Sequence, residues 1–223
     1  MTDASLKCIS DLVHSSGARI ADLGAGTGRL TKPLVERGFE VVAIEPSRSM
    51  LDVLEGKIGT GIEGFESINS SMAAFQTAPV DLAVCVFTVF TYVTEEDEMF
   101  LSLENIIRHL KPGGLFLFDL ASDLFFQNGI VMSHRSHDLT REMEMETLEG
   151  ELFKVTDHIS TFHEGKDFTF TESFHVRRWE RGTVSSYLNG LGMSEVDFDD
   201  SAFRFTGSRY FLFQKGGSSD EEL

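Results

Sequence analysis

Cysteine is scarce in this chain, and so are long apolar runs. Cys8 and Cys85 are the two cysteines among 223 residues, too few for a disulfide framework or a thiolate metal site. No segment approaches the roughly 20 consecutive apolar residues of a membrane-spanning helix, and the N-terminus lacks the basic and then apolar layout of a secretory signal. We therefore expect a soluble, cytoplasmic protein with buried free thiols and no membrane partner.

Basic residues are also few. Acidic residues outnumber them by 36 to 19, which gives a formal net charge of −17. A field of this sign repels a polyanion and weakens the phosphate contacts that dominate nucleic-acid affinity. The charge therefore predicts no nucleic-acid partner.

Most of the histidines lie between His134 and His175, which raises the question of a metal site. They fall on different predicted strands, and no cysteine lies near them in the sequence. Spacing of this kind is not that of a zinc site. We expect no metal.

Helices and strands alternate from the N-terminus to Asp119. Helices are expected at 4–14, 29–36 and 94–110, and a further helix is expected to begin after Ser47, which caps it. Strands are expected at 17–23, 40–45, 65–71, 80–90 and 115–119. Thr94 and Asp97 resemble a capping box, and "KPGG" is expected to end the last of these helices. Alternation of this kind predicts a parallel sheet covered on both faces.

The pattern changes to period two after Asp119. The segments "REMEMETL", "ELFKVTDHISTF" and "KDFTFTESFHV" predict an antiparallel meander, and a helix at 183–191 and strands at 193–198 and 209–215 follow. The predicted fold class is α/β, with a Rossmann-like doubly wound, mostly parallel seven-stranded sheet and an antiparallel β insert. The predicted divisions are a core of 1–129 and 179–215, a lid of 130–178 and a disordered tail of 216–223.

Three glycines occupy every second position after the first strand, in "DLGAGTG". Gly24, Gly26 and Gly28 follow the carboxyl end of that strand, where open parallel sheets bind ligands. Glycine permits backbone angles that other residues resist and lets a ligand approach the main chain, although a turn of this kind can also serve packing alone. Glu45 closes the next strand, where a carboxylate can accept both hydroxyls of a ribose. The combination predicts an adenosine-containing cofactor.

The glycine spacing decides between adenosine cofactors. Dinucleotide-binding proteins use G-x-G-x-x-G, but Arg29 stands where their third glycine belongs. No G-x-x-x-x-G-K-[ST] phosphate loop is present. The spacing therefore argues against a dehydrogenase and against phosphate-loop nucleotide binding.

The chain resembles the class I S-adenosylmethionine-dependent methyltransferases, particularly the small-molecule group. The resemblance lies in D-x-G-x-G-x-G after a strand, in the acid that closes the next strand and in the "PSRSML" that follows it. The run "VDLAVCVFTVFTYV" is similar to that family's fourth strand and following loop, and "LKPGGLFLFD" to its helix end and fifth strand. The period-two insert and "ESFHVRRW" resemble the lid of bacterial sugar N-methyltransferases. The core motifs span Arg19 to Asp119.

The resemblance implies S-adenosylmethionine as the cofactor. Glu45 would hold its ribose hydroxyls, and Ser71 stands where the family often has an aspartate that accepts the adenine amino group. A serine hydroxyl accepts that hydrogen bond without charge assistance. The expected cofactor contacts are Asp22, Gly24, Ala25, Gly26, Gly28, Glu45, Pro46, Met50, Ser71, Met72 and Val86.

Catalytic residues are expected from the loops after the fourth and fifth strands and from the insert, which surround the pocket mouth. Tyr92 can hydrogen-bond an acceptor or cap the core. In the strand 167–177, His175 lies on a polar face that lines an acceptor pocket or faces solvent. Glu172 interrupts the apolar face, where a carboxylate is costly unless it is paired or hydrated. Tyr92, Glu172 and His175 are the candidate catalytic residues.

The function predicted from this resemblance is methyl transfer from S-adenosylmethionine to a nitrogen or oxygen of a small polar metabolite. The alternative is a non-catalytic S-adenosylmethionine-binding protein, which the serine at position 71 keeps open. The sequence has neither a basic track nor the N-P-P-[YF] motif of amino-group nucleic-acid methyltransferases. We expect a small-molecule acceptor and a homodimer.

Overall fold

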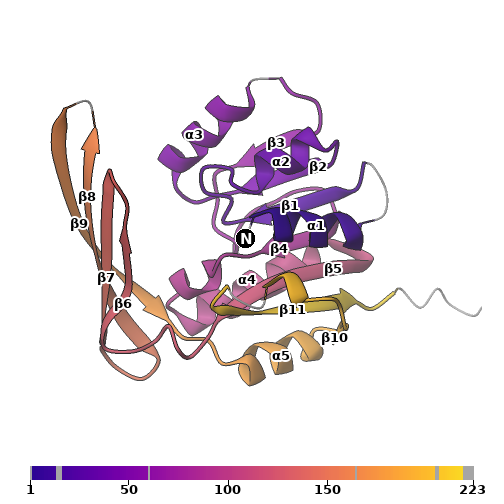
Figure 1. The fold of residues 1–223 in the computed structure, drawn as a ribbon. Coiled ribbons are helices and arrows are strands. Elements are labelled where there is room, and N and C mark those ends of the chain that lie inside the picture. Colours follow the sequence, from indigo (N-terminus) through magenta and orange to yellow (C-terminus); the bar gives the residue numbers. More distant parts are fainter. Residues whose placement is uncertain (1, 14–16, 60, 164, 204–205, 218–223) are drawn as a thin grey trace, which may run out of the picture.

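The computed structural model describes residues 2–13, 17–59, 61–163, 165–203 and 206–217, which form two β-sheets and five α-helices (Figure 1). The strands of the larger sheet are β1 (Arg19–Leu23), β2 (Glu40–Ile44), β3 (Phe65–Ile68), β4 (Val80–Cys85), β5 (Leu110–Ala121), β10 (Met193–Glu195) and β11 (Ser208–Lys215). The smaller sheet contains β6 (Gly129–Arg135), β7 (Leu139–Thr147), β8 (Leu152–His163) and β9 (Lys166–Arg177). The α-helices are α1 (Thr2–Leu12), α2 (Thr31–Glu36), α3 (Arg48–Ile58), α4 (Glu96–Arg108) and α5 (Arg181–Gly190), and the 3-10 helices are η1 (Val89–Tyr92) and η2 (Ser201–Phe203).

The larger sheet has the strand order β10-β11-β5-β4-β1-β2-β3. Strands β1 to β5 are parallel, whereas β11 is antiparallel to β5 and to β10. The chain runs outward from β1 to β2 and β3 and then continues on the other side with β4 and β5. The direction of winding therefore reverses beside β1, and such a switch point leaves a crevice at the carboxyl ends of the strands. The predicted fold class is confirmed.

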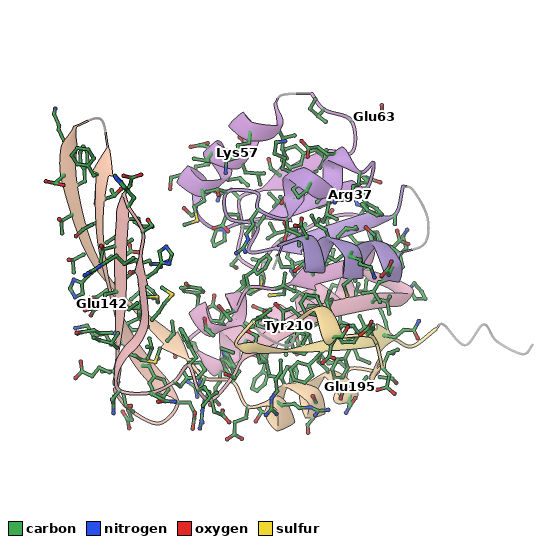
Figure 2. All side chains as sticks on the ribbon, in the orientation of Figure 1. Arg37, Lys57, Glu63, Glu142, Glu195 and Tyr210 are labelled. Carbon is green, nitrogen blue, oxygen red and sulfur yellow. The ribbon has the colours of Figure 1, made fainter. Side chains whose placement is uncertain are left out.

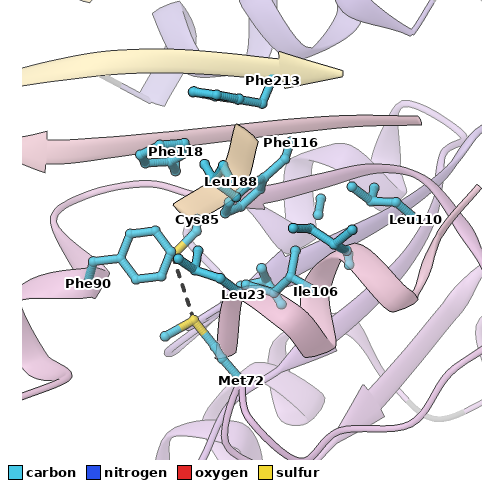
Figure 3. Packing of buried hydrophobic residues seen from close by; sticks show 14 of the residues in the cluster. Leu23, Met72, Cys85, Phe90, Ile106, Leu110, Phe116, Phe118, Leu188 and Phe213 are labelled. Carbon is cyan, nitrogen blue, oxygen red and sulfur yellow. Dashed lines mark hydrogen bonds between the residues drawn. The ribbon is translucent and has the colours of Figure 1, made fainter. Parts of the chain in front are cut away.

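Apolar side chains pack on both faces of this sheet, because strands buried on two sides are apolar throughout their length. One cluster lies under α4 and α5 and contains Phe90, Phe116 and Phe118 (Figure 3). Cys85 belongs to it, with its Sγ 3.7 Å from Sδ of Met72. Cys85 is therefore the buried thiol that was expected, while Cys8 is only partly buried.

Two segments differ from the prediction at the ends of helix α4. "KPGG" does not end the helix, since α4 already ends at Arg108 and β5 begins at Leu110. The register of β5 with β4 shifts between Val80 and Leu82. Gly113 accommodates this bulge with a φ of 75°. At the other end, Glu95 is the N-cap residue and makes no side-chain capping bond, so the predicted capping box of Thr94 and Asp97 is wrong.

The strand predicted for 80–90 ends at Cys85. Phe87 and Thr88 have φ values of 70° and 62°, which an extended strand cannot contain. The chain turns there and enters η1. The composition of the run indicates burial, but it does not show this turn.

The smaller sheet has the order β6-β7-β8-β9 and is antiparallel throughout. It stands beside the core, next to the side on which α3 and α4 lie (Figure 1). Its side chains project from both faces (Figure 2). We call this sheet the lid sheet. Of the tail predicted for 216–223, residues 218–223 lie outside the described residues.

Candidate active site

The glycine loop between β1 and α2 is fixed by backbone hydrogen bonds. The amides of Gly24 and Ala25 donate to the carbonyl of Ile44, at 2.9 and 3.1 Å, and the amide of Gly28 donates to the carbonyl of Ala25 at 3.0 Å. All three glycines have positive φ values, of 70°, 56° and 84° in order. The loop therefore needs glycine at every second position to hold this shape.

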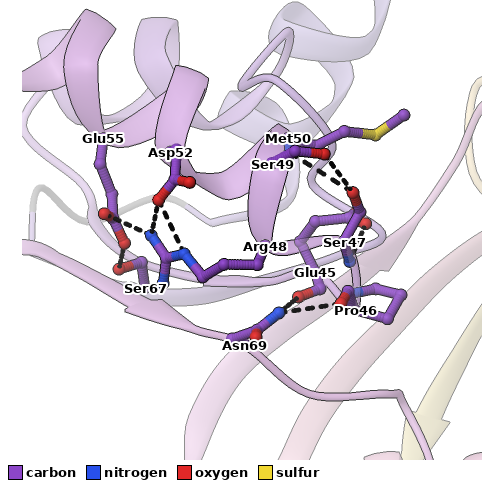
Figure 4. A network of polar contacts seen from close by, with 10 residues as sticks. All are labelled: Glu45, Pro46, Ser47, Arg48, Ser49, Met50, Asp52, Glu55, Ser67 and Asn69. Atoms are coloured by element: carbon purple, nitrogen blue, oxygen red, sulfur yellow. Dashed lines mark hydrogen bonds and ion pairs between the residues drawn. The ribbon is translucent and has the colours of Figure 1, made fainter.

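Glu45 follows β2 and lies beside this loop. Its side chain is buried, and its two carboxylate oxygens each accept one backbone hydrogen bond, from Gly26 N and from Ser47 N, both at 2.9 Å. Asn69 donates to the carbonyl oxygens of Glu45 and Pro46, at 2.9 Å each, and so fixes the turn behind it (Figure 4). Each carboxylate oxygen keeps further acceptor capacity, so the pair can receive two vicinal hydroxyls.

A cavity of about 420 Å³ opens beside Glu45. This volume lies within the roughly 300–1,000 Å³ of small-molecule sites. The cavity is lined by Gly24, Gly26, Glu45, Pro46, Ser47, Met50, Ser71, Met72, Val89, Tyr92, Val93, Glu98 and Ser102. Seven of the expected cofactor contacts, Gly24, Gly26, Glu45, Pro46, Met50, Ser71 and Met72, thus meet at one cavity, together with the catalytic candidate Tyr92.

The remaining expected cofactor residues do not line the cavity. Ala25 packs in a small cluster with α3, and Val86 belongs to the core on the other side of the sheet. Asp22 is buried and accepts a hydrogen bond from Thr31 Oγ1 at 2.5 Å. Burial raises the pKa of Asp22 to about 6, which the hydrogen bonds from Thr31 oppose. None of these residues, nor Gly28, is among the cavity-lining ones.

Asp119, at the end of β5, holds the turn that precedes η1. The amide of Thr88 donates to both of its carboxylate oxygens, at 2.9 and 3.1 Å. Because Phe87 and Thr88 are left-handed and neither is glycine, this turn is strained. Burial raises the pKa of Asp119 to about 6, against the effect of these hydrogen bonds.

The far end of η1 is held from the lid side. The indole nitrogen of Trp179 donates to the carbonyl oxygens of Phe90 and Val93, at 3.0 Å each. Arg177, the last residue of β9, donates to the carbonyl of Thr94 at 3.0 Å and pairs with Glu96. The cavity wall carrying Val89, Tyr92 and Val93 is therefore attached directly to the root of the lid sheet.

The lid sheet turns one face toward Tyr92. The rings of Tyr92 and Phe174 have centroids 5.6 Å apart. Glu172 shares a face of β9 with Phe174, because side chains alternate along a strand. His175 points to the opposite face and is exposed, next to Lys154 of β8. The structure thus brings Glu172 to the side of Tyr92 and does not bring His175 there.

The described residues contain no group of three or more metal-ligating side chains. Within the same parts of the chain, no helix is both long enough and apolar enough to cross a membrane.

Sequence reasoning missed five cavity residues: Ser47, Val89, Val93, Glu98 and Ser102. Ser47 was expected only as a helix cap, a role that its 3.4 Å bond from Met50 N confirms. Glu98 and Ser102 are spaced four apart on α4, which is a signal for a shared helix face. Which face of α4 reaches the cavity depends on packing and carries no signal in the sequence.

Comparisons with known proteins agree with this arrangement. A methyltransferase domain family matches residues 20–114. A protein of Geobacillus sp. (strain WCH70) described as a methyltransferase is 32% identical over 211 residues, or 88% of this chain and 84% of that protein. The cypemycin N-terminal methyltransferase of Streptomyces sp. is 35% identical over 112 residues, or 50% of this chain and 45% of that protein. The chain thus spans less than half the length of the latter.

Solved structures share the whole fold. A S-adenosylmethionine-dependent methyltransferase from Clostridium acetobutylicum superposes with a TM-score of 0.80 at 21% identity, covering 97% of this chain and 91% of the other. A sugar N-methyltransferase from Streptoalloteichus sp. has a TM-score of 0.77 at 17% identity, covering 96% and 87%. The fold and the motifs are those of class I S-adenosylmethionine-dependent methyltransferases. The chain belongs to the methyltransferase family.

Proposed function

We propose that the chain transfers a methyl group from S-adenosylmethionine to a nitrogen or oxygen atom of a small polar acceptor. The observation that carries this proposal is the carboxylate of Glu45, fixed by two backbone amides at the rim of the cavity and able to accept two further hydroxyls. A ribose presents such a pair of hydroxyls.

The cavity fits the rest of an adenosine group. Met50, Met72 and Pro46 contribute apolar surface to the cavity that Glu45 also lines, and an adenine ring can pack against it. The hydroxyl of Ser71 makes no hydrogen bond with a described residue, so it is available to the adenine amino group. Gly26 leaves the main chain uncovered beside Glu45, since a Cβ there would meet no atom closer than 4.0 Å.

The bound sulfonium supplies the methyl group and leaves as a neutral thioether. The remaining tasks of the protein are to align the acceptor lone pair with the methyl carbon, to exclude water and to receive the proton that the acceptor loses. Tyr92 lies at the cavity and Glu172 lies on the lid face beside it, so both are placed to contact the acceptor. His175 is not proposed for either task because it faces away.

We infer a nitrogen acceptor in particular. The support is that two similar structures are N-methyltransferases by name, the Streptoalloteichus sugar N-methyltransferase and a glycopeptide N-methyltransferase. The exposed carboxylate of Glu172 can balance the positive charge of an amine before it loses its proton. The non-catalytic alternative is not favoured, because the relatives are described as methyltransferases.

The test is the affinity of Glu45→Ala for S-adenosylhomocysteine, measured by calorimetry. Loss of the two hydrogen bonds from ribose should weaken binding by about 2–4 kcal/mol, in the range for bonds to a charged group. Asn69→Ala, which loosens the turn behind Glu45 without removing the carboxylate, should have a smaller effect. Unchanged affinity of Glu45→Ala would remove Glu45 from the site, and wild-type protein that binds neither this product nor S-adenosylmethionine would reject the proposed cofactor.

We further propose a homodimer in the cytoplasm. The support for association is the pair of stacked rings of Phe168 and Phe170 on the lid sheet, which are 40% and 56% exposed. Exposed aromatic pairs are typical of surfaces that a partner covers. Sedimentation velocity of the wild type should give a dimer, and a monomer at micromolar concentration would contradict the proposal.

A further inference from the structure

The face of the lid sheet that contacts Tyr92 carries charged groups as well as apolar ones. Arg141 of β7 and Asp157 of β8 have the same strand parity as Met143 and Val155, which are buried with Phe174. Asp157 lies directly opposite Glu172 of β9. Arg141, Asp157 and Glu172 all act electrostatically on the Tyr92 hydroxyl, where burial together with the two carboxylates raises the pKa and Arg141 opposes the change. The four polar groups therefore form one cluster beside the cavity.

Asp157 fixes the orientation of Arg141. Nε of Arg141 donates to both carboxylate oxygens of Asp157, at 3.1 and 2.9 Å, and Nη2 donates to Oδ2 at 2.5 Å. The side chain of Asp157 is fully buried, while that of Arg141 is 40% exposed. One edge of the guanidinium is thus occupied, and its Nη1 makes no hydrogen bond with any described residue.

The stability of the lid sheet does not by itself explain the pairing of Arg141 with the buried Asp157. A buried carboxylate carries a large desolvation cost, and replacing such a pair by apolar residues is often neutral or stabilising. An arginine held along one edge by a carboxylate presents its other edge in a fixed direction, which suits recognition of a second planar oxyanion. The side chain of Arg141 is 40% exposed, and its charge acts on the Tyr92 hydroxyl.

The charges of this region have both signs. The cavity lining contains Glu45 and Glu98 and no lysine or arginine. On the same face of the lid sheet, the only described lysine or arginine besides Arg141 is Lys166, six residues from Glu172 along β9, or about 20 Å in an extended strand. A purely anionic acceptor would meet the carboxylate of Glu172, and a purely cationic one would leave the free edge of Arg141 without a partner.

We propose that Arg141 and Glu172 form an acceptor subsite for a small amine that also carries a carboxylate, with Arg141 binding the carboxylate and Glu172 facing the amine. This inference rests on the proposed function. Asp157 is a positioning residue, which directs the guanidinium and does not contact the acceptor. In the transfer, the amine lone pair forms the new bond to the methyl carbon, the electron pair of the broken carbon–sulfur bond stays on sulfur, and the amine proton leaves to Glu172 or to water.

The experiment compares amino acids with their amides, which lack the carboxylate. A panel of the standard amino acids and the matching amino acid amides is offered to the full chain with S-adenosylmethionine, and kcat/KM is measured for each pair. Binding of the same panel to the protein loaded with S-adenosylhomocysteine is measured by calorimetry. We expect kcat/KM for an amino acid to exceed kcat/KM for its amide by roughly tenfold or more, which is the preference that a hydrogen-bonded charge pair provides.

Arg141→Gln should remove that preference by lowering kcat/KM for the acid about tenfold while leaving the amide unchanged. Asp157→Asn should raise KM for the acid more than it lowers kcat, because it misdirects the guanidinium. The matched control is Arg135→Gln, since Arg135 is exposed on the opposite face of the same sheet, opposite Thr140. Affinity for S-adenosylhomocysteine should be unchanged in all three variants, which also shows that they are folded.

Equal activity on acids and amides, or a preference that survives Arg141→Gln, would overturn the subsite. So would failure of every panel member to bind at millimolar concentration while S-adenosylhomocysteine binds. Failure to bind S-adenosylhomocysteine at all would instead overturn the proposed function. The two failures are therefore distinguishable in one set of measurements.

Discussion

Gly26 and Gly28 both have left-handed φ values, yet the structure assigns them different purposes. Gly26 lines the cavity and has open space where a Cβ would stand. Gly28 lies away from the cavity, and a Cβ there would be 2.2 Å from Cδ1 of Leu54, a fully buried side chain of α3. At the scale of single residues, one glycine leaves open space at the cavity and the other leaves room for a helix.

Alanine substitution should separate these two purposes. Gly28→Ala should lower the free energy of unfolding by about 1–3 kcal/mol, because it adds both a clash and an unfavourable φ. Gly26→Ala should cost about 1 kcal/mol for its φ alone but should also weaken binding of S-adenosylhomocysteine. Urea denaturation and calorimetry on both variants check this, and equal stability of Gly28→Ala and the wild type would contradict it.

At the scale of elements, η1 is the part of the core that both lines the cavity and contacts the root of the lid sheet. Its start is held by Asp119 through Thr88, and its end is held by Trp179, between the lid sheet and α5. It carries Val89 and Tyr92 into the cavity. The root of the lid sheet is therefore connected to the cavity wall by the two hydrogen bonds of the Trp179 indole, beside the contacts of Arg177 with Thr94 and Glu96.

Trp179→Phe should keep the buried ring and remove those hydrogen bonds. We expect a loss of about 1–2 kcal/mol in the free energy of unfolding and weaker binding of S-adenosylhomocysteine, because the wall formed by η1 becomes looser. Tyr187→Phe is the matched control: it also removes a side-chain hydrogen bond, the 2.6 Å contact with Glu104, but this bond joins α5 to α4 and does not involve η1. A control that weakens binding as much as Trp179→Phe does would refute the specific role of η1.

At the scale of the whole molecule, the carboxyl edge of the sheet concentrates buried acids in a chain that is already strongly acidic. Burial raises the pKa of both Asp22 and Asp119 from 3.8 to about 6. A raised pKa in the folded state means that stability is fully present below the unfolded value, near pH 4, and is lost as pH rises through about 6. Ionisation of these groups therefore opposes folding at neutral pH.

Asp119→Asn should reveal this cost. The difference in free energy of unfolding between the variant and the wild type should increase from pH 4 to pH 7, in favour of the variant, by up to roughly 3 kcal/mol. This amount corresponds to a pKa raised by about 2. Denaturation series at the two pH values measure the difference, with the exposed Asp167→Asn as the control for loss of charge alone. A difference that does not change with pH would show that the carboxyl of Asp119 does not titrate in this range.

Local patterns predicted much of the fold and most of the expected residues that line the cavity. Apolar runs fixed the central strands, and the glycines with Glu45 indicated the cavity, because both signals depend on residues close together in the chain. The bulge at Gly113 and the turn at Phe87 and Thr88 could not be predicted in this way. They depend on pairing with β4 and on the carboxylate of Asp119, which are remote in sequence.

By itself, the sequence determined the class of protein, the order of its helices and strands and most of the residues that it predicted to meet at one cavity, since these follow from periodicity and from short motifs. Only the tertiary structure decided which face of each lid strand meets the cavity. Alternation divides a strand into two faces but does not say which face meets the cavity, so His175 and Glu172 both stayed candidates until Phe174 was seen against Tyr92. The same packing brought Arg141 and Asp157, which no local pattern marks, to the side of the cavity.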